Sequence, residues 1–89
     1  MFEWHEFRLL VGVEPGTLDS WVAEGWLLPR RHDDTPRFTD IDVARAQLIL
    51  DLGRGMGVNP EGIDVILALV DQVHGLRRTV RTLLEQQPR

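Results

Sequence analysis

The residues of this sequence whose types could do chemistry are mostly carboxylates, and their spacing favours binding over catalysis. Fourteen acidic residues stand against ten arginines, with no lysine, so the net charge is −4 at pH 7. The absence of cysteine excludes disulfides, thiolate nucleophiles and cysteine zinc sites. His5, His32 and His74 are far apart and lack the helical spacing of metal ligands. We therefore expect no catalytic residue, no metal site and no cofactor, and hence no enzyme.

The most informative carboxylates lie in one short segment, residues 14–25. This segment carries Glu14, Asp19 and Glu24 and no basic residue. It follows a short predicted helix and a Gly-Val turn, which is where a helix-turn-helix places the helix that reads DNA. Carboxylates are repelled by phosphates, so this helix is poorly suited to a DNA groove. Two interpretations stay open at this stage, a solvated acidic face and a contact surface for a partner.

The acidic character extends over most of the chain but not to its end. Residues 1–71 hold thirteen acids and six arginines, which gives −7. Residues 72–89 hold one acid and four arginines, which gives +3 and completes the total of −4. Such a charge distribution repels polyanions over most of the surface and attracts basic partners.

The elements that must position these residues are four helices and a hairpin. Helices are predicted over residues 2–11, over 15–24 with Gly25 as a left-handed cap, and from Asp40 to Gly53 or Gly55. Residues 26–38 predict a small β-hairpin in the place of a wing. Thr39 with Asp42 predicts a capping box for the third helix. Asn59 followed by Pro60 predicts the start of a long fourth helix reaching about Gln86.

The length predicts a single domain, with a winged helix-turn-helix module over residues 1–58 and a long C-terminal helix over residues 59–89. The two apolar stripes of the third helix predict that it is sandwiched between neighbours. Residues 63–70 are nearly all apolar and are expected to be buried on several sides. The three tryptophans are expected in the core, although Trp26 directly follows Gly25 and is a candidate half-exposed anchor for a partner.

The fourth helix also carries a row of apolar residues at alternating spacings of three and four, which is typical of a coiled coil. This apolar seam consists of Ile66, Leu69, Val73, Leu76, Val80 and Leu83. Two interpretations remain open, pairing with a second copy of the chain and packing on its own domain. Asp64 and Asp71 lie seven residues apart on one face of the same helix and are candidate partner contacts. Gly75 is a position where this helix could bend.

The order of these elements resembles the MerR-type winged helix-turn-helix. The resemblance implies a mainly all-α fold with a small β-hairpin wing and a long C-terminal helix. One position departs from the DNA-binding members, in which an arginine usually follows the apolar residue of the recognition helix. Here Asp19 follows Leu18. The matching motifs are Phe2-x-x-x-Glu6-Phe7, Gly12-Val13, Thr17-Leu18-x-x-Trp21, Glu24-Gly25-Trp26-Leu27-x-Pro29, Arg37-Phe38-Thr39-x-x-Asp42 and Met56-Gly57-Val58-Asn59-x-Glu61-Gly62-Ile63.

The second half of the chain is similar to the CbpM chaperone-modulator family, over residues 44–52, 56–59 and 62–77. Members of this family are small MerR-like proteins that bind and restrain a J-domain co-chaperone of the DnaJ type. The resemblance implies an inhibitor that binds the basic surface of a J-domain through an acidic helical face. The residues that would make this contact are Asp19, Glu24, Trp26, Asp64 and Asp71.

The alternative function is a small MerR-like transcriptional regulator that uses the wing arginines Arg30, Arg31 and Arg37 on DNA. Asp33 and Asp34 lie between these arginines and partly cancel their field, so direct nucleic-acid binding is not the main expectation. No apolar run is long enough for a membrane span and no signal peptide is evident, so we expect a cytoplasmic protein without a membrane partner.

Overall fold

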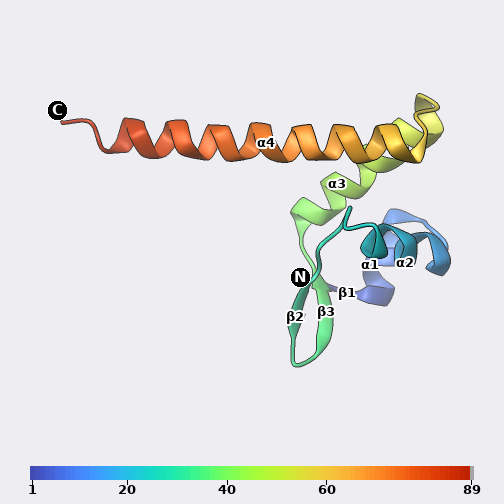
Figure 1. Ribbon diagram of the computed structural model, residues 1–89. Helices are drawn as coiled ribbons and strands as arrows, with labels where there is room; N and C mark the ends of the chain where they lie inside the picture. Colours follow the sequence, from blue (N-terminus) through green and yellow to red (C-terminus); the bar gives the residue numbers. More distant parts are fainter. Residues whose placement is uncertain (89) are drawn as a thin grey trace. The chain divides into compact units, whose positions relative to one another are not determined.

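The computed structural model describes residues 1–88, which fall into two compact units. The first unit, Met1–Val58, holds three α-helices, a turn of π-helix and a three-stranded sheet. The second begins at Asn59 and is essentially one long helix, α4. The fold is mainly helical, as the sequence predicted, and Figure 1 shows the elements along the chain. No helix among the described residues is both long and apolar enough to cross a membrane.

The sheet contains one strand that the sequence did not predict. Its antiparallel order is β1 (Phe2–Glu3), β3 (Thr35–Phe38), β2 (Arg30–His32), and Phe2 lies opposite Phe38. The predicted helix over residues 2–11 is therefore wrong at its start, because the first helix, α1, covers Trp4–Val11. Glu3 caps it: the Glu3 carboxylate accepts the Glu6 N–H at 2.9 Å, and the Glu6 carboxylate accepts the Glu3 N–H at 3.2 Å.

The helix-turn-helix is formed by α1 and α2 (Pro15–Ala23). Gly12 ends α1 in the left-handed conformation, and Pro15 starts α2 at a position where its missing N–H is no loss. Gly25 has φ +77°, as the sequence predicted. Beside it, the Gly25 N–H donates to the Val22 carbonyl at 3.1 Å and the Trp26 N–H to the Trp21 carbonyl at 2.9 Å. These two bonds close the end of α2 in a Schellman motif.

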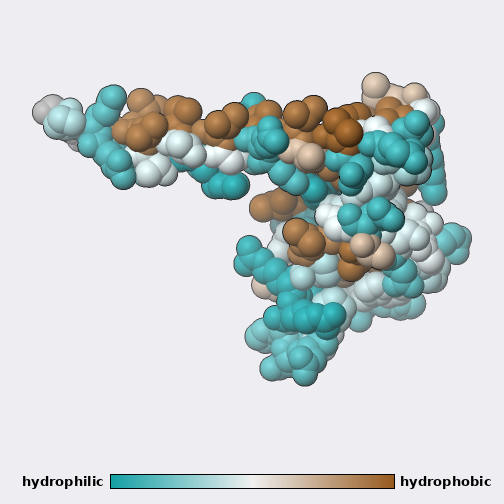
Figure 2. All heavy atoms as spheres, viewed as in Figure 1, coloured by the Kyte–Doolittle hydropathy of each residue, from teal (hydrophilic) through white to brown (hydrophobic). Residues whose placement is uncertain are grey.

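The predicted wing is confirmed as the hairpin of β2 and β3. Asp33 and Asp34 form its two-residue turn, with φ values of +52° and +61°. Positive φ at both central residues is the conformation of a type I′ turn, whose twist matches that of the flanking strands. The hairpin is covered by hydrophilic side chains (Figure 2).

The third helix, α3 (Asp40–Leu50), begins at the predicted capping box. The Asp42 carboxylate accepts the backbone N–H of Thr39 at 2.8 Å. The helical run reaches Gly55, but its last turn, η1 (Asp51–Gly55), is π-helical. The prediction that α3 is packed against neighbours on two sides is wrong at its first turn, where Ile41 is 79% exposed. The reason is that α1 packs against α3 from one side, while the face that carries Ile41 is left open to solvent.

The core of the first unit is formed by apolar side chains from every helix and from the wing. The largest fully buried ones are Phe7, Leu18, Leu27 and Phe38. Trp21 and Trp26 join this core, whereas Trp4 is only half-buried. The core thus joins the helix-turn-helix to the base of the hairpin.

The fourth helix, α4 (Pro60–Glu85), is continuous through Gly75. Its start is as predicted, because the Asn59 side chain accepts the Gly62 N–H at 2.8 Å. The expected burial of residues 63–70 on several sides is wrong. Ile63 and Leu67, four residues apart on one face, are buried, but Val65 and Leu69 are more than half exposed.

Candidate partner-binding surfaces

Three exposed acidic residues lie along α2 and its two caps, about 140° apart around the helix axis, and no basic residue accompanies them. Glu14 is the N-cap residue, Asp19 lies in the middle of the helix and Glu24 is the C-cap residue, and all three are exposed. No hydrogen bond or ion pair engages their carboxylates among residues 1–88. The inward face of the helix carries buried Leu18 and Trp21. The packing of α2 therefore presents its carboxylates to solvent, where they are available to a partner.

Glu24 is the most telling of these acids, because helix stability does not explain it. The C-terminal end of a helix carries partial negative charge, and an acid there is unfavourable by roughly 0.3–1 kcal/mol. The last turn of α2 has no basic residue to offset this repulsion. Glu24 is thus an exposed carboxylate that does not stabilise its own helix.

Trp26 lies in the core, as expected of the three tryptophans, so its candidate role as a half-exposed anchor is wrong. Its side chain is only 7% exposed and belongs to the core. The turn at Gly25 folds Trp26 back, so that its N–H reaches the Trp21 carbonyl. Its own carbonyl accepts a hydrogen bond from Nε of Arg45 on α3. Trp26 thus fixes the end of α2 from inside and is not an exposed anchor in this conformation.

The two acids predicted on the fourth helix lie in the other compact unit. Asp64 and Asp71 are both exposed, and their spacing of seven places them on one face of α4. Asp19 and Glu24 belong to the first unit. The candidate contacts therefore form two separate sets, one on each unit.

The apolar seam is exposed along most of α4. Ile66 is half-buried, and the five residues from Leu69 to Leu83 are exposed, with Leu76 66% accessible. Figure 2 shows the corresponding row of hydrophobic side chains along this helix. An apolar row of this length on one helix typically marks an interaction site.

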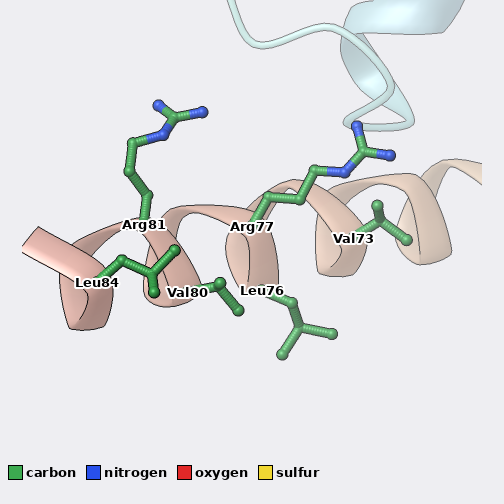
Figure 3. Close-up of a pocket in the computed structure, with 6 residues that line it drawn as sticks. All are labelled: Val73, Leu76, Arg77, Val80, Arg81 and Leu84. Carbon is green, nitrogen blue, oxygen red and sulfur yellow. The ribbon is translucent and has the colours of Figure 1, made fainter.

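The seam is bordered by residues that sequence reasoning had not assigned to it. A shallow depression is lined by Val73, Leu76, Arg77, Val80, Arg81 and Leu84. In Figure 3, Arg77 and Arg81 extend together from one side of α4, while Leu76 and Val80 point to another. A second depression is lined by Ile66, Leu69, Val70, Val73, His74 and Arg77. The signal in the sequence was the position directly after each leucine of the seam, which gives Val70, Arg77 and Leu84.

The wing arginines are the residues that a DNA-binding function would need. Arg30 and Arg31 are exposed on β2, and Arg37 is half-buried on β3. The Arg31 guanidinium donates to the Asp34 carbonyl at 3.4 Å. The tip of the wing holds two carboxylates, and Nε2 of His32 lies 3.8 Å from Oδ2 of Asp33. The basic charge of the wing is thus partly offset at its tip.

Comparison with known proteins identifies a family. A family model described as MerR HTH family regulatory protein matches residues 2–85, which is nearly the whole chain. No curated protein and no solved structure matches the chain. The winged helix-turn-helix agrees with this match. MerR-like regulatory proteins are typically not enzymes, and residues 1–88 contain no cluster of potential metal ligands.

Proposed function

The chain belongs to the MerR helix-turn-helix family of regulatory proteins, and we propose that within this family it is a protein-binding modulator that inhibits a J-domain co-chaperone. The observation that carries the proposal is the charge of α2 and its two caps. In the place of a DNA-reading helix, this segment exposes Glu14, Asp19 and Glu24 and no basic side chain. The helix α2 has the position of a DNA-recognition helix in the fold, but its negative charge suits contact with a basic protein surface.

The similarity of residues 44–77 to the CbpM family supports a J-domain as that basic surface. In the mechanism that this similarity implies, the chain covers the basic helix through which a J-domain contacts its Hsp70 partner. Complementary charge would steer the encounter, and buried apolar contacts would supply most of the affinity. Inhibition would result from competitive occlusion, without any chemical step.

The direct test is binding to the cognate J-domain protein. Purified chain is titrated against the immobilised J-domain protein at low and at physiological salt. We expect a complex whose association rate falls as salt rises, because exposed charges are screened. The absence of a complex at tens of micromolar would exclude this function.

A charge-reversal pair tests whether α2 is the contact face. Asp19→Arg combined with Glu24→Arg should slow association by roughly tenfold at low salt, since two steering charges change sign. Glu61→Arg combined with Glu85→Arg is the matched control, because it changes the net charge by the same +4 at two exposed positions of α4, in the other compact unit. An equal effect of both variants would show only a dependence on net charge and would remove α2 from the interface.

The second candidate function is DNA binding, which the family description and the exposed Arg30 and Arg31 favour. Its signature would be an affinity that falls steeply with salt. The logarithm of the binding constant should fall with the logarithm of the salt concentration, with a slope of about −0.9 for each phosphate contact. A gel shift at 50 mM salt with duplex DNA tests it, with Arg30→Ala and Arg31→Ala as variants. A retarded band that weakens in both variants would favour this function over the first.

A further inference from the structure

The proposed complex needs apolar anchors, and α2 does not supply them. Complementary charge speeds association, but most of the affinity of an interface comes from a few side chains that become fully desolvated. The large apolar side chains of α2 are not available for this, because Leu18 and Trp21 are buried and Val22 is half-buried. Trp26 lies in the core as well. The anchors for a partner must therefore come from another element.

Most of the exposed apolar side chains of the first unit are isolated. The large ones among residues 1–58 are Met1, Leu9, Leu10, Leu28, Ile41 and Met56. Within this list, Leu9 and Leu10 are the only two that share a helix or strand, namely α1. Single exposed apolar residues are common on protein surfaces, whereas neighbouring ones more often mark a binding site. The helix α1 is therefore the best source of anchors in this unit.

The geometry of α1 places these two leucines around one carboxylate. Phe7 and Val11 are buried and define the inward side of the helix. With about 100° between successive residues, Leu9 lies on the opposite side and Leu10 on the flank, in agreement with exposed fractions of 64% and 55%. Glu6 comes three residues before Leu9 and four before Leu10, so it neighbours both on the helix surface.

The charge on this side of α1 is negative. Glu6 is exposed, and its carboxylate is held in place by the N–H of Glu3 at 3.2 Å. Arg8, the one arginine of α1, lies about 160° away from Glu6 around the helix axis. Its Nη1 donates to the Val13 carbonyl at 3.2 Å, at the turn that leads to α2. The guanidinium therefore does not neutralise Glu6.

The two leucines are also held rigidly. The reciprocal cap of Glu3 and Glu6 fixes the start of α1, and the Gly12 N–H donates to the Arg8 carbonyl at 2.8 Å at its end. An anchor on a helix that is fixed at both ends loses little conformational entropy on binding. Only residues 12–14 separate α1 from α2, so one partner can reach both helices.

We propose that Leu9 and Leu10 are the apolar anchors of the J-domain interface, and that Glu6 beside them receives a basic side chain of the same J-domain helix. This inference rests on the proposed function and adds a second contact to the acids of α2. The surface that fits is a basic amphipathic helix, whose apolar residues cover the two leucines while an arginine or lysine one turn away meets Glu6. The acids of α2 then steer the encounter, and α1 sets how long the complex lasts.

The first experiment separates these two roles by kinetics. Leu9→Ala and Leu10→Ala are each measured against the immobilised J-domain protein. Each should raise the dissociation rate about tenfold or more and leave the association rate nearly unchanged, because no charge is altered. Alanine is the best helix former, and circular dichroism verifies that α1 is kept.

Leu28→Ala is the matched control. It makes the same change at a side chain that is 77% exposed, but Leu28 is followed by Arg30 and Arg31, which repel a basic partner. Its dissociation rate should stay within about twofold of that of the native chain. Unchanged dissociation in both α1 variants, or an equal effect of Leu28→Ala, would overturn the inference and leave the proposed function standing. No complex with the native chain would instead refute the proposed function, and this inference with it.

The second experiment tests the carboxylate. Glu6→Gln removes the charge but keeps an oxygen that can accept the Glu3 N–H, so the start of α1 is preserved. It should lower the affinity about threefold or more at low salt, and this loss should shrink at high salt. Glu61→Gln is the control, because it removes one charge at an exposed position of the other unit. Equal losses in the two variants would remove Glu6 from the interface.

Discussion

The aromatic ring of Phe7 stacks on that of Phe38, with ring centroids 4.2 Å apart and planes inclined by 11°. Both side chains are fully buried. Phe7 comes from α1 and Phe38 is the last residue of β3, so this pair joins the helix-turn-helix to the base of the wing. This contact and the pairing of β1 with β3 together hold the wing within the first unit.

Phe38→Ala should destabilise the first unit by about 3–5 kcal/mol, since it removes a buried ring and leaves a cavity against Phe7. Urea unfolding followed by tryptophan fluorescence measures the change. Leu28→Ala is the control, because Leu28 is 77% exposed and its loss should change stability by less than about 0.5 kcal/mol. Similar losses in the two variants would mean that the stacked pair contributes nothing special to the core.

Two glycine substitutions should act in opposite directions. Gly25→Ala should cost about 1 kcal/mol, because Gly25 has φ +77° and a side chain disfavours this conformation. Gly75→Ala should stabilise α4 by about 1 kcal/mol, because Gly75 lies in a helix interior and an added Cβ meets only the Arg78 side chain at 3.8 Å. Thermal unfolding and helical ellipticity measure both changes. Two shifts of the same sign would contradict the assignment.

Asp34→Gly should stabilise the wing by a few tenths to about 1 kcal/mol. Asp34 has φ +61° at the second position of the type I′ turn, where glycine is preferred. Asp34→Asn separates conformation from charge, since asparagine tolerates positive φ and also removes the carboxylate. The melting temperature should be highest for the glycine variant. Equal gains in the two variants would assign the effect to charge alone.

Asp42→Ala should cost about 1 kcal/mol by opening the capping box of α3. It would leave the Thr39 N–H, now 2.8 Å from the Asp42 carboxylate, without its acceptor. Asp40→Ala is the control in the same first turn, because Asp40 is exposed and contributes only through the helix dipole. Urea unfolding should show the larger loss for Asp42→Ala, and the reverse order would contradict the role of the cap.

Helix ends were predictable from the sequence wherever one residue type acts locally. Three helix boundaries could be read from a few neighbouring residues, and the structure confirms them: those marked by Thr39 with Asp42, by Asn59 with Pro60, and by Gly25. The strand at Phe2 was missed because it exists only through pairing with Phe38, far along the chain. The only local sign that α1 begins after Glu3 was the reciprocal cap of Glu3 and Glu6. It was easy to miss, because glutamate is an uncommon N-cap residue.

Burial was less predictable than helix position, because it depends on which faces find a neighbour. Val65 and Trp4 show this, since both were expected to be buried, and Val65 is exposed and Trp4 only half-buried. The exposed acidic surface of α2 was predictable, because Leu18 and Trp21 fix which side of the helix faces inward. Whether that surface binds a partner is a question of recognition, which the helix pattern does not encode.

The exposure of α4 beyond Gly75 has a consequence for amide hydrogen exchange. Every side chain from Leu76 to Gln86 is exposed, so tertiary packing gives these turns little support and they should open locally at low free energy. Amides in the first unit, such as that of Phe7, should instead exchange at a rate set by unfolding of that unit. Protection of the last turns of α4 should therefore be far lower than protection of the Phe7 amide.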